Sequence, residues 1–146
     1  MSDYPLPNAA TDLSGRVALV TGASSGLGAR FAEVLASQGA AVVLAARRLD
    51  RLEALADKIK AGGGKALAVQ MDATDADSII AAVAAGEAAF GTIDILVNNA
   101  GMPDAQRAHK MSLELIDQVL GVNLRGPWIL ACEVARRKYR AYCFIQ

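Results

Sequence analysis

The sequence predicts an α/β fold, an open, doubly wound parallel sheet with helices in the crossovers between strands. Four short apolar runs alternate with longer segments in which apolar residues recur at helical spacing, and glycines punctuate the boundaries. At 146 residues, 53% of them hydrophobic, the chain is long enough for one domain with a buried core. The predicted strands are 17–20, 41–45, 66–69 and 93–97, in the sheet order 3-2-1-4.

The first strand runs into a glycine-rich turn and then a helix. Gly22, Gly26 and Gly28 allow a tight turn, a close backbone approach and close helix packing respectively. Such a loop points backbone N–H groups and the positive end of the helix at one place, and Ser24 and Ser25 add hydroxyl donors. We interpret this loop as a phosphate site; the alternative is a flexible surface turn.

The helix after this loop connects the first strand to the second. Leu27, Phe31 and Leu35 lie four residues apart and predict its apolar face. Gly39 then predicts the C-terminal cap, and the second strand follows at 41–45. A strand, helix and strand of this length make a right-handed crossover, which strengthens the phosphate-site interpretation.

The second strand ends in Ala46-Arg47-Arg48. Many dinucleotide-binding domains carry an acid at this place, where it binds the adenosine ribose. Here two arginines follow instead, and a guanidinium can pair with a 2′-phosphate. This favours NADP (NADPH) over NAD as the cofactor. The alternative is two arginines at a solvated helix start.

The second helix carries its apolar residues at 49, 52, 55 and 59, and the third strand closes in Asp72. At the carboxyl edge of the sheet this carboxylate either accepts from an adenine amino group or serves as a turn residue. Thr74 with Asp77 resembles a capping box that opens the third helix.

The fourth strand ends in Asn98-Asn99-Ala100-Gly101. Two amides and two small residues suit a flat ligand close to the backbone, and the amides can tie neighbouring strand ends together. After a polar loop, in which His109 is interpreted as solvated, Ser112 is expected to cap a helix. Helical spacing continues to Val134, with a kink expected at Pro127.

Composition excludes several classes of partner. The formal net charge is zero, which argues against nucleic acid and against an anionic membrane surface. Cys132 and Cys143 form neither a metal-ligand nor a disulfide pattern, so no metal is expected and a reducing cytoplasm is the predicted location. The start of the chain shows no signal peptide.

With these elements placed, the chain resembles the short-chain dehydrogenase/reductase family over about 13–137. The motifs are Thr21-Gly22-Ala23-Ser24-Ser25-Gly26-Leu27-Gly28, Asp72, Asn98-Asn99-Ala100-Gly101, and Asn123 followed by Gly126. The resemblance implies a Rossmann-type fold and hydride transfer between a nicotinamide cofactor and a small-molecule alcohol or carbonyl. It implies a pyrophosphate cradle at Gly22–Gly28, adenine contacts from Asp72 and Ala73, and ribose contacts from Asn99–Gly101. Cofactor-binding residues implied in all are Thr21, Gly22, Ser24, Ser25, Gly26, Leu27, Gly28, Arg47, Arg48, Asp72, Ala73, Asn98, Asn99, Ala100 and Gly101.

Of the family's catalytic set only Asn123 has a counterpart here. The matching Asn in relatives holds a water that links a catalytic Lys to the proton relay. A Ser and a Tyr-x-x-x-Lys pair complete that set, with Tyr as acid/base and Lys lowering its pKa. Tyr139 and Tyr142 have Cys143 and Gln146 at the Lys position. We therefore expect the cofactor-binding half of an oxidoreductase that is inactive alone; the alternatives are a non-catalytic dinucleotide sensor and an S-adenosylmethionine-dependent methyltransferase, which would want an acid where Arg47 lies.

The predicted organisation is an extended arm at 1–14, an incomplete NAD(P)-binding Rossmann domain at 15–137 and an atypical tail at 138–146, rich in aromatics. The tail suggests a truncated or frame-shifted reading of a longer gene, or a natural short form in which 142–145 adds a short fifth strand. Because later strands are missing, we expect the 93–97 edge to be exposed and the chain to self-associate, as a homo-oligomer or through that edge and the fourth helix.

Overall fold

The computed structural model describes residues 12–103 and 106–143, with the side chains of 141–143 excepted. Its centre is a four-stranded parallel sheet in the order β3-β2-β1-β4, which confirms the predicted topology. The strands are β1 Val17–Thr21, β2 Ala41–Ala46, β3 Lys65–Gln70 and β4 Ile95–Val97. The order reverses between β2 and β4 around β1, and at such a switch point open α/β sheets bind ligands.

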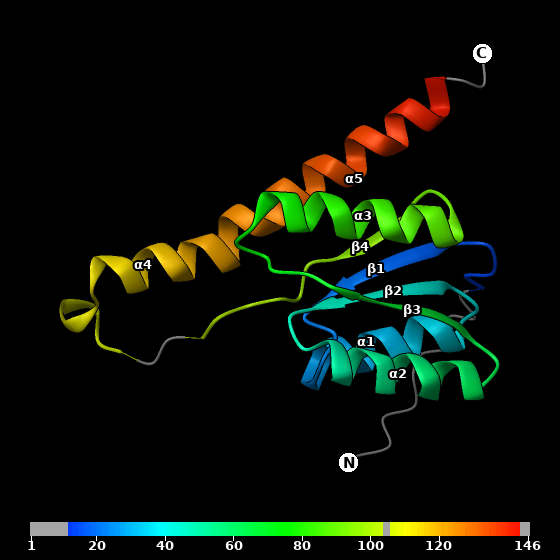
Figure 1. Cartoon of the computed structure of the whole chain (residues 1–146), viewed down its shortest axis with the longest axis horizontal. Coiled ribbons are helices and arrows are strands. Elements are labelled where there is room, and N and C mark those ends of the chain that lie inside the picture. The colour runs from blue at the N-terminus through cyan, green and yellow to red at the C-terminus, as the bar shows by residue number, and fades with distance from the viewer. Residues whose placement is uncertain (1–11, 104–105, 144–146) are drawn as a thin grey trace.

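Helices cover both faces of the sheet (Figure 1). One layer holds α1 and α2, and the opposite layer holds α3 and α5. The chain between β4 and α5 leaves this sandwich and forms a projecting arm with α4. The helices are α1 Gly26–Ser37, α2 Leu49–Ala61, α3 Ala76–Phe90, the 3₁₀ turn η1 Ala108–Lys110, α4 Leu113–Leu120, the π-helical turn η2 Gly121–Arg125 and α5 Gly126–Cys143.

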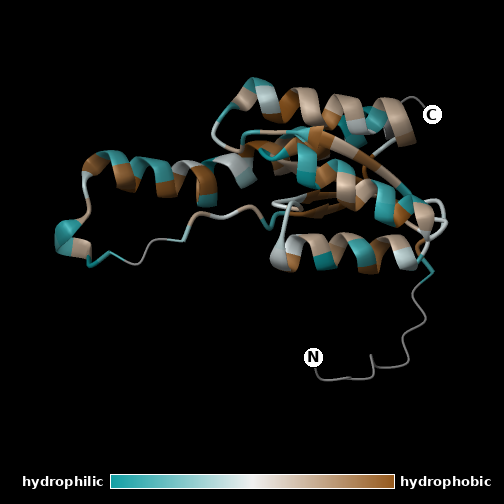
Figure 2. Ribbon diagram, turned by 60° about the horizontal axis from the view of Figure 1, so that its bottom comes forward, coloured by the Kyte–Doolittle hydropathy of each residue, from teal (hydrophilic) through white to brown (hydrophobic). Residues whose placement is uncertain are grey.

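The two core clusters follow from strand alternation. Val17 and Leu19 of β1 face α3 and α5, whereas Ala18 and Val20 face α1 and α2. Every residue of β1 is buried. A strand buried on both faces reads as a continuous apolar run rather than an alternating one, which is why the sequence marked it so clearly. Figure 2 shows this hydrophobic sheet between helices with mixed faces.

The apolar face predicted for α1 is confirmed at Leu35, which packs against the core, and is wrong at Leu27 and Phe31. Leu27 is 69% exposed and Phe31 40% exposed, while Gly28 and Ala32 are the residues buried under the helix. Small residues at this contact let α1 lie close to the strand it follows, so larger apolar residues turn outward.

Two local predictions near the third and fourth strands also need correction. The N-cap of α3 is Asp75, whose carboxylate accepts from the Asp77 N–H, so Thr74 does not cap it. β4 begins at Ile95 rather than at residue 93. Asp94, just before it, contacts the start of β1 through its side chain, whose carboxylate accepts the Val17 N–H at 3.2 Å.

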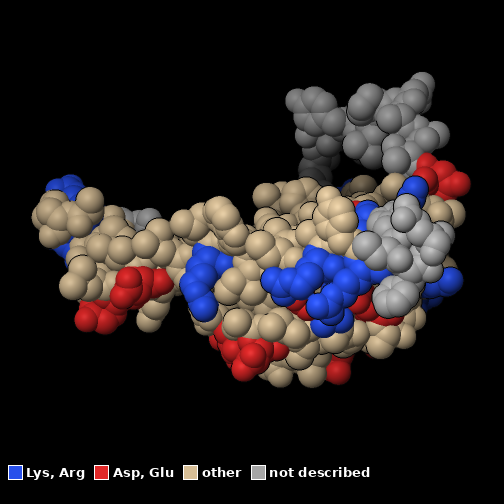
Figure 3. All heavy atoms as spheres, turned by 90° about the horizontal axis from the view of Figure 1, so that it is seen from above, with Lys and Arg blue, Asp and Glu red and all other residues tan. Residues whose placement is uncertain are grey.

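The tail does not add a strand to the sheet. Helix α5 continues to Cys143, so a fifth strand at 142–145 is wrong for its first two residues, and 144–146 lie outside the described residues. Ion pairs spaced for a helix support this: buried Glu133 accepts from Arg136 and Arg137, and Arg137 also reaches Glu87 of α3. These carboxylates, Glu133 first, raise the pKa of Arg137. In Figure 3 Lys and Arg gather on the α3–α5 face beside acidic side chains.

The irregularity expected at Pro127 is found one turn earlier. The π-helical turn η2 joins α4 directly to α5, and Pro127 is then the second residue of α5. Because helical backbone runs through Gly126, the missing N–H of Pro127 interrupts the hydrogen-bond ladder directly after the π-helical turn. Among the described residues, no helix is both long and apolar enough to cross a membrane.

At the other end, the Leu13 N–H donates to the Gln38 carbonyl and its side chain packs on the α1–α2 core. The remainder of the predicted arm, 1–11, lies outside the described residues.

Candidate functional site

A cleft of about 900 Å³ opens at the carboxyl ends of the strands. It is lined by the turn after β1, the segments that follow β2, β3 and β4, and residues of α4 and η2. Ten of the predicted site residues line it: Gly22, Ser24, Ser25, Arg47, Arg48, Asp72, Ala73, Asn99, Ala100 and Gly101. The structure therefore brings together residues from four separate sequence segments.

The glycine loop has the backbone that only glycine adopts easily. Gly22 and Gly26 have φ of +66° and +58°. A Cβ on Gly22 would lie 2.9 Å from the Ala100 Cα, and a Cβ on Gly28 would overlap the Gly22 carbonyl. A Cβ on Gly26 would meet nothing within 4 Å, so this glycine has open space beside it. The loop is thus held tightly against the sheet at Gly22 and Gly28 and free of contact at Gly26.

Thr21 and Asn99 bind the glycine loop to the end of β4. The buried Thr21 Oγ1 accepts the N–H groups of Asn99 and Ala100, both at 3.0 Å. The Asn99 amide in turn donates to the Thr21 carbonyl at 3.2 Å. This confirms the expectation that an amide ties neighbouring strand ends together. Thr21 supports the cleft from behind rather than lining it.

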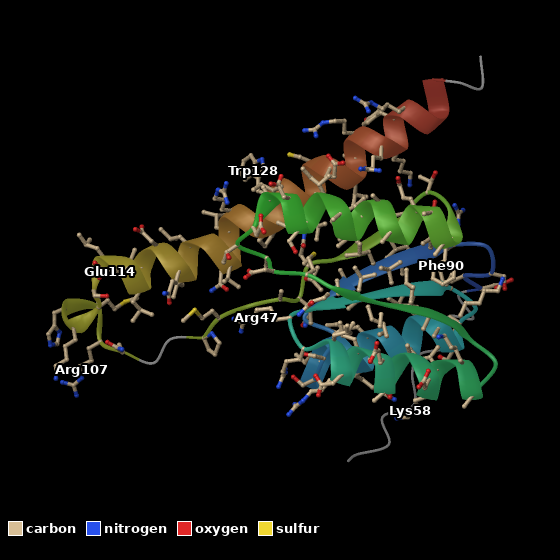
Figure 4. The ribbon with its side chains drawn as sticks, in the orientation of Figure 1. Arg47, Lys58, Phe90, Arg107, Glu114 and Trp128 are labelled. Atoms are coloured by element: carbon tan, nitrogen blue, oxygen red, sulfur yellow. The ribbon has the colours of Figure 1, made fainter. Side chains whose placement is uncertain are left out.

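Two arginines provide positive charge at the end of β2. Figure 4 shows Arg47 beside the strand ends, and both Arg47 and Arg48 line the cleft. Arg48 Nη2 donates to Ser24 Oγ at 2.9 Å and to Ser25 Oγ at 3.0 Å. Both arginines are exposed at the start of α2, so the 2′-phosphate contact stays a prediction beside the alternative of a solvated helix start.

Asp72 forms a turn at the edge of the cleft. Its Oδ1 accepts the Thr74 N–H at 2.8 Å and the Thr74 hydroxyl at 2.7 Å. These hydrogen bonds, and more weakly the charge of Arg47, lower the pKa of Asp72. The turn alternative is therefore present in the structure. The adenine contact stays a prediction, because the same carboxylate also lines the cleft.

Asn123 lies in η2 and holds the loop that follows β4. Its Oδ1 accepts the Met102 N–H at 2.7 Å, and its Nδ2 donates to the Met102 carbonyl at 3.0 Å. The π-helical turn that carries it is a feature often found at functional sites. Directly after the turn, Gly126 lies close to the segment that follows β3, since a Cβ on Gly126 would overlap the Ala73 carbonyl.

Some predicted residues lie outside the cleft lining. Asn98 donates to the Pro127 carbonyl at 3.4 Å and so faces α5, while Leu27 points to solvent. Conversely, eight lining residues were not predicted as site residues: Ala45, Ala46, Met71, Thr74, Met102, Pro103, Gln118 and Val122. Six of them lie at the ends of β2 to β4 or just after these strands, whereas Gln118 and Val122 reach the cleft only because α4 and η2 run back toward the sheet. No group of metal-ligating side chains occurs in the described part of the chain.

The arrangement suits an extended anionic ligand. Two hydroxyls and two guanidinium groups line one cleft at the switch point of the sheet, next to the N-terminus of α1. A family model described as short chain dehydrogenase matches residues 16–140. The chain belongs to this family.

Dehydrogenases of two bacteria are similar to it. The chain is 40% identical over 129 residues to a D-threitol dehydrogenase of Mycolicibacterium smegmatis, covering 88% of this chain and 50% of that protein. It is 42% identical to an L-rhamnose 1-dehydrogenase (NAD(P)(+)) of Azotobacter vinelandii, covering 86% and 50%. The chain thus spans about half the length of these relatives.

Solved structures agree. A metagenomic short-chain oxidoreductase in complex with NADP is 41% identical with a TM-score of 0.84, covering 90% of this chain and 60% of that one. A short-chain dehydrogenase/reductase from Serratia marcescens is 41% identical with a TM-score of 0.83, covering 86% and 52%. The Rossmann-type fold expected from the sequence is therefore confirmed.

Proposed function

We propose that this chain binds NADP(H) in its cleft, in preference to NAD(H), as the cofactor-binding part of a carbonyl or alcohol oxidoreductase. The observation that carries the proposal is the meeting of the glycine loop with Arg47 and Arg48 at one edge of the sheet. Neither residue directly after β2 is an acid that could bind the ribose hydroxyls or repel a phosphate, since both are arginine. The NADP complex of a structural relative at 41% identity supports it.

In this proposal each cleft segment takes one part of the dinucleotide. The Gly22–Gly28 loop holds the pyrophosphate, with Thr21 and Leu27 shaping the loop. Arg47 pairs with the 2′-phosphate, because its guanidinium offers a fork of donors that matches a phosphate. Asp72 and Ala73 contact adenine. Asn98 to Gly101 lie by the nicotinamide-side ribose, with Asn98 shaping that segment from the α5 side.

The proposal separates binding from catalysis. Asn123 is the residue that matches the family's catalytic set, and its amide groups are both engaged with Met102. The chain as given has no Tyr followed four residues later by Lys. We therefore expect this chain to bind cofactor without catalysing hydride transfer. Loss of a general acid/base group alone typically lowers a reaction rate by about 10²–10⁴-fold. A non-catalytic sensor is the alternative, and a structural response to tight NADPH binding would favour it.

We also propose self-association, in a cytoplasmic protein. Leu113, Leu120, Leu124 and Trp128 are 50–75% exposed along α4, η2 and the start of α5. β4 is an edge strand of the described sheet. Exposed apolar side chains and an open strand edge both favour contact with a second copy. Sedimentation velocity tests this: Leu120→Glu with Trp128→Glu is expected to shift the chain to monomer, and a monodisperse monomer before mutation would contradict the proposal.

Titration of NADPH and NADH by cofactor fluorescence tests the cofactor assignment. NADPH is expected to bind at least tenfold more tightly, as one charge-assisted pair contributes about 1.5–3 kcal/mol. Arg47→Ala should remove most of this difference and leave NADH binding unchanged. Arg51→Ala is the matched control, because Arg51 is exposed on α2 and does not line the cleft. Tighter binding of NADH would overturn the assignment.

A further inference from the structure

We infer that Arg48 is a positioning residue that keeps the N-terminus of α1 open for the cofactor, by holding the Ser25 hydroxyl away from it. The inference rests on the proposed function, because the occupant of that N-terminus is taken to be the pyrophosphate. It assigns Arg48 a task different from the 2′-phosphate contact given to Arg47.

Ser25 stands at the position where a serine normally caps its own helix. It is the N-cap residue of α1, with extended backbone at φ −170° and ψ 169°. A serine there usually accepts the N–H of the second or third helical residue, here Leu27 or Gly28. Its side chain makes no such bond in this structure. The contrast with Ser112, which caps α4 by accepting the Leu115 N–H at 3.2 Å, shows that the chain forms the ordinary cap elsewhere.

Arg48 is the partner that takes this hydroxyl. Its Nη2 donates to Ser25 Oγ at 3.0 Å and also to Ser24 Oγ at 2.9 Å. Arg48 is itself the N-cap residue of α2 and makes no side-chain cap. The bond therefore links the starts of two helices across the cleft edge, and it joins the glycine loop to the end of β2.

The chemistry of the pair has two consequences for an anion. First, the Ser25 hydroxyl does not bind the N–H groups of Leu27 and Gly28. These N–H groups, at the positive end of the helix, can therefore bind an anion. Second, a guanidinium only donates, so each serine oxygen accepts from Arg48 and its own O–H hydrogen must point elsewhere. Both hydroxyls line the cleft and are thereby set to donate to a phosphate oxygen.

Without Arg48, Ser25 is expected to cap α1 itself. A side-chain cap of ordinary strength is worth about a fivefold change in an equilibrium constant, and the cofactor would have to displace it. Because pyrophosphate is common to both cofactors, Arg48→Ala is expected to weaken NADPH and NADH by the same factor, about fivefold. Arg47→Ala, one residue away, should weaken NADPH alone.

Rescue by a second substitution tests the inference. Adding Ser25→Ala to Arg48→Ala removes the competing cap and should recover part of the lost affinity, short of what the Ser25 hydroxyl itself donates to phosphate. Ser25→Ala in the unaltered chain should not improve affinity. Ser24→Ala is the matched control, since Ser24 also binds Arg48 but is not the N-cap residue, and it should give no rescue. Arg48→Lys should bind cofactor nearly as well as the unaltered chain, because an ammonium group can donate to both hydroxyls.

Amide hydrogen exchange of the free chain, followed residue by residue by NMR, gives a readout that needs no cofactor. Arg48→Ala should slow exchange at Leu27 and Gly28, and Ser25→Ala should reverse this. If Arg48→Ala does not fold, Arg48→Met keeps the stem of the side chain and carries the same expectations. Unchanged exchange, a loss confined to NADPH, or equal rescue by Ser24→Ala would overturn the inference. A chain that binds neither cofactor but shows the exchange changes would instead refute the proposed function alone.

Discussion

The β1–β2 centre of the sheet and the α4 arm are both rich in apolar residues, but only the first buries them. All of β1 and the first five residues of β2 are buried. None of the eight residues of α4 is buried, and Leu113 is 75% exposed. An apolar pattern therefore predicts that a face needs a partner, and does not say whether this chain supplies it.

The physical reason is the number of layers. β1 and β2 lie between helices on both faces, so each side chain has a neighbour whichever way it points. α4 lies beyond the edge of the sandwich, where the described chain covers little of it. In Figure 4 Glu114 and Arg107 mark the outer end of this arm, and Trp128 lies near its junction with the sandwich. A leucine therefore contributes more to the stability of the fold in the sheet than in the arm.

A pair of leucine substitutions is the strongest way to test this difference. Leu44→Ala empties a fully buried position of β2 and is expected to lower the free energy of unfolding by about 3 kcal/mol. Leu120→Ala, at a position that is 50% exposed, should change it by less than about 0.5 kcal/mol. Urea unfolding of both variants, at a concentration where the chain is monomeric, measures the contrast. Equal losses would show that the arm is as well packed as the sheet.

A pair of glycine substitutions tests the same difference in the backbone. Gly28→Ala places a methyl group against the Gly22 carbonyl and should lower the free energy of unfolding by about 2 kcal/mol. At Gly121 a methyl would meet only Thr74 Cγ2 at 3.7 Å in helical backbone, so Gly121→Ala should raise it by about 0.5 kcal/mol. Thermal unfolding resolves opposite signs, and a stabilising Gly28→Ala would mean that the loop is not closely packed.

The smallest expected difference is in the pH dependence of stability, between Asp72 at the cleft and Glu114 on the arm. Hydrogen bonds from Thr74 hold the pKa of Asp72 below its ordinary 3.8, and bonds at the α4 N-terminus, from its own backbone N–H and then Ser112, lower the pKa of Glu114 from 4.5. A lowered folded-state pKa stabilises the fold above the unfolded value and loses that stabilisation as pH falls through the folded value. In Asp72→Asn the free energy of unfolding should therefore fall less steeply with decreasing pH below about pH 4, which is near the unfolded-state pKa of an aspartate. Glu114→Gln, at a fully exposed group, should have a smaller effect of the same kind. Urea midpoints between pH 6 and pH 2.5, about the span of these pKa values, measure both slopes; a larger effect at Glu114 would reverse the comparison.

Local patterns predicted the parts of this protein that depend on neighbours in the chain. Continuous apolar runs marked β1 and β2, and glycines at 22, 26 and 28 marked a loop whose backbone needs them. Helical spacing failed in the first part of α1, where Leu27 and Phe31 are exposed, although Leu35 packs against the core as predicted. Capping failed at α3, where Thr74 was drawn to Asp72 and left the cap to Asp75.

By itself, the sequence determined the glycine loop and the charge at the end of β2, because each depends on residue type and spacing within one segment. It also predicted the sheet order, because helical crossovers between successive strands restrict how parallel strands can be arranged. Only the tertiary structure decided which side chains share the cleft. The Asn123 clamp on Met102 spans 21 residues and the Thr21 bonds to Asn99 span 78. The Arg48 bonds to Ser24 and Ser25 appear only when the ends of β1 and β2 lie side by side. Contacts of this kind leave no periodicity in the chain, because they arise from the packing of elements that the chain brings together from far apart.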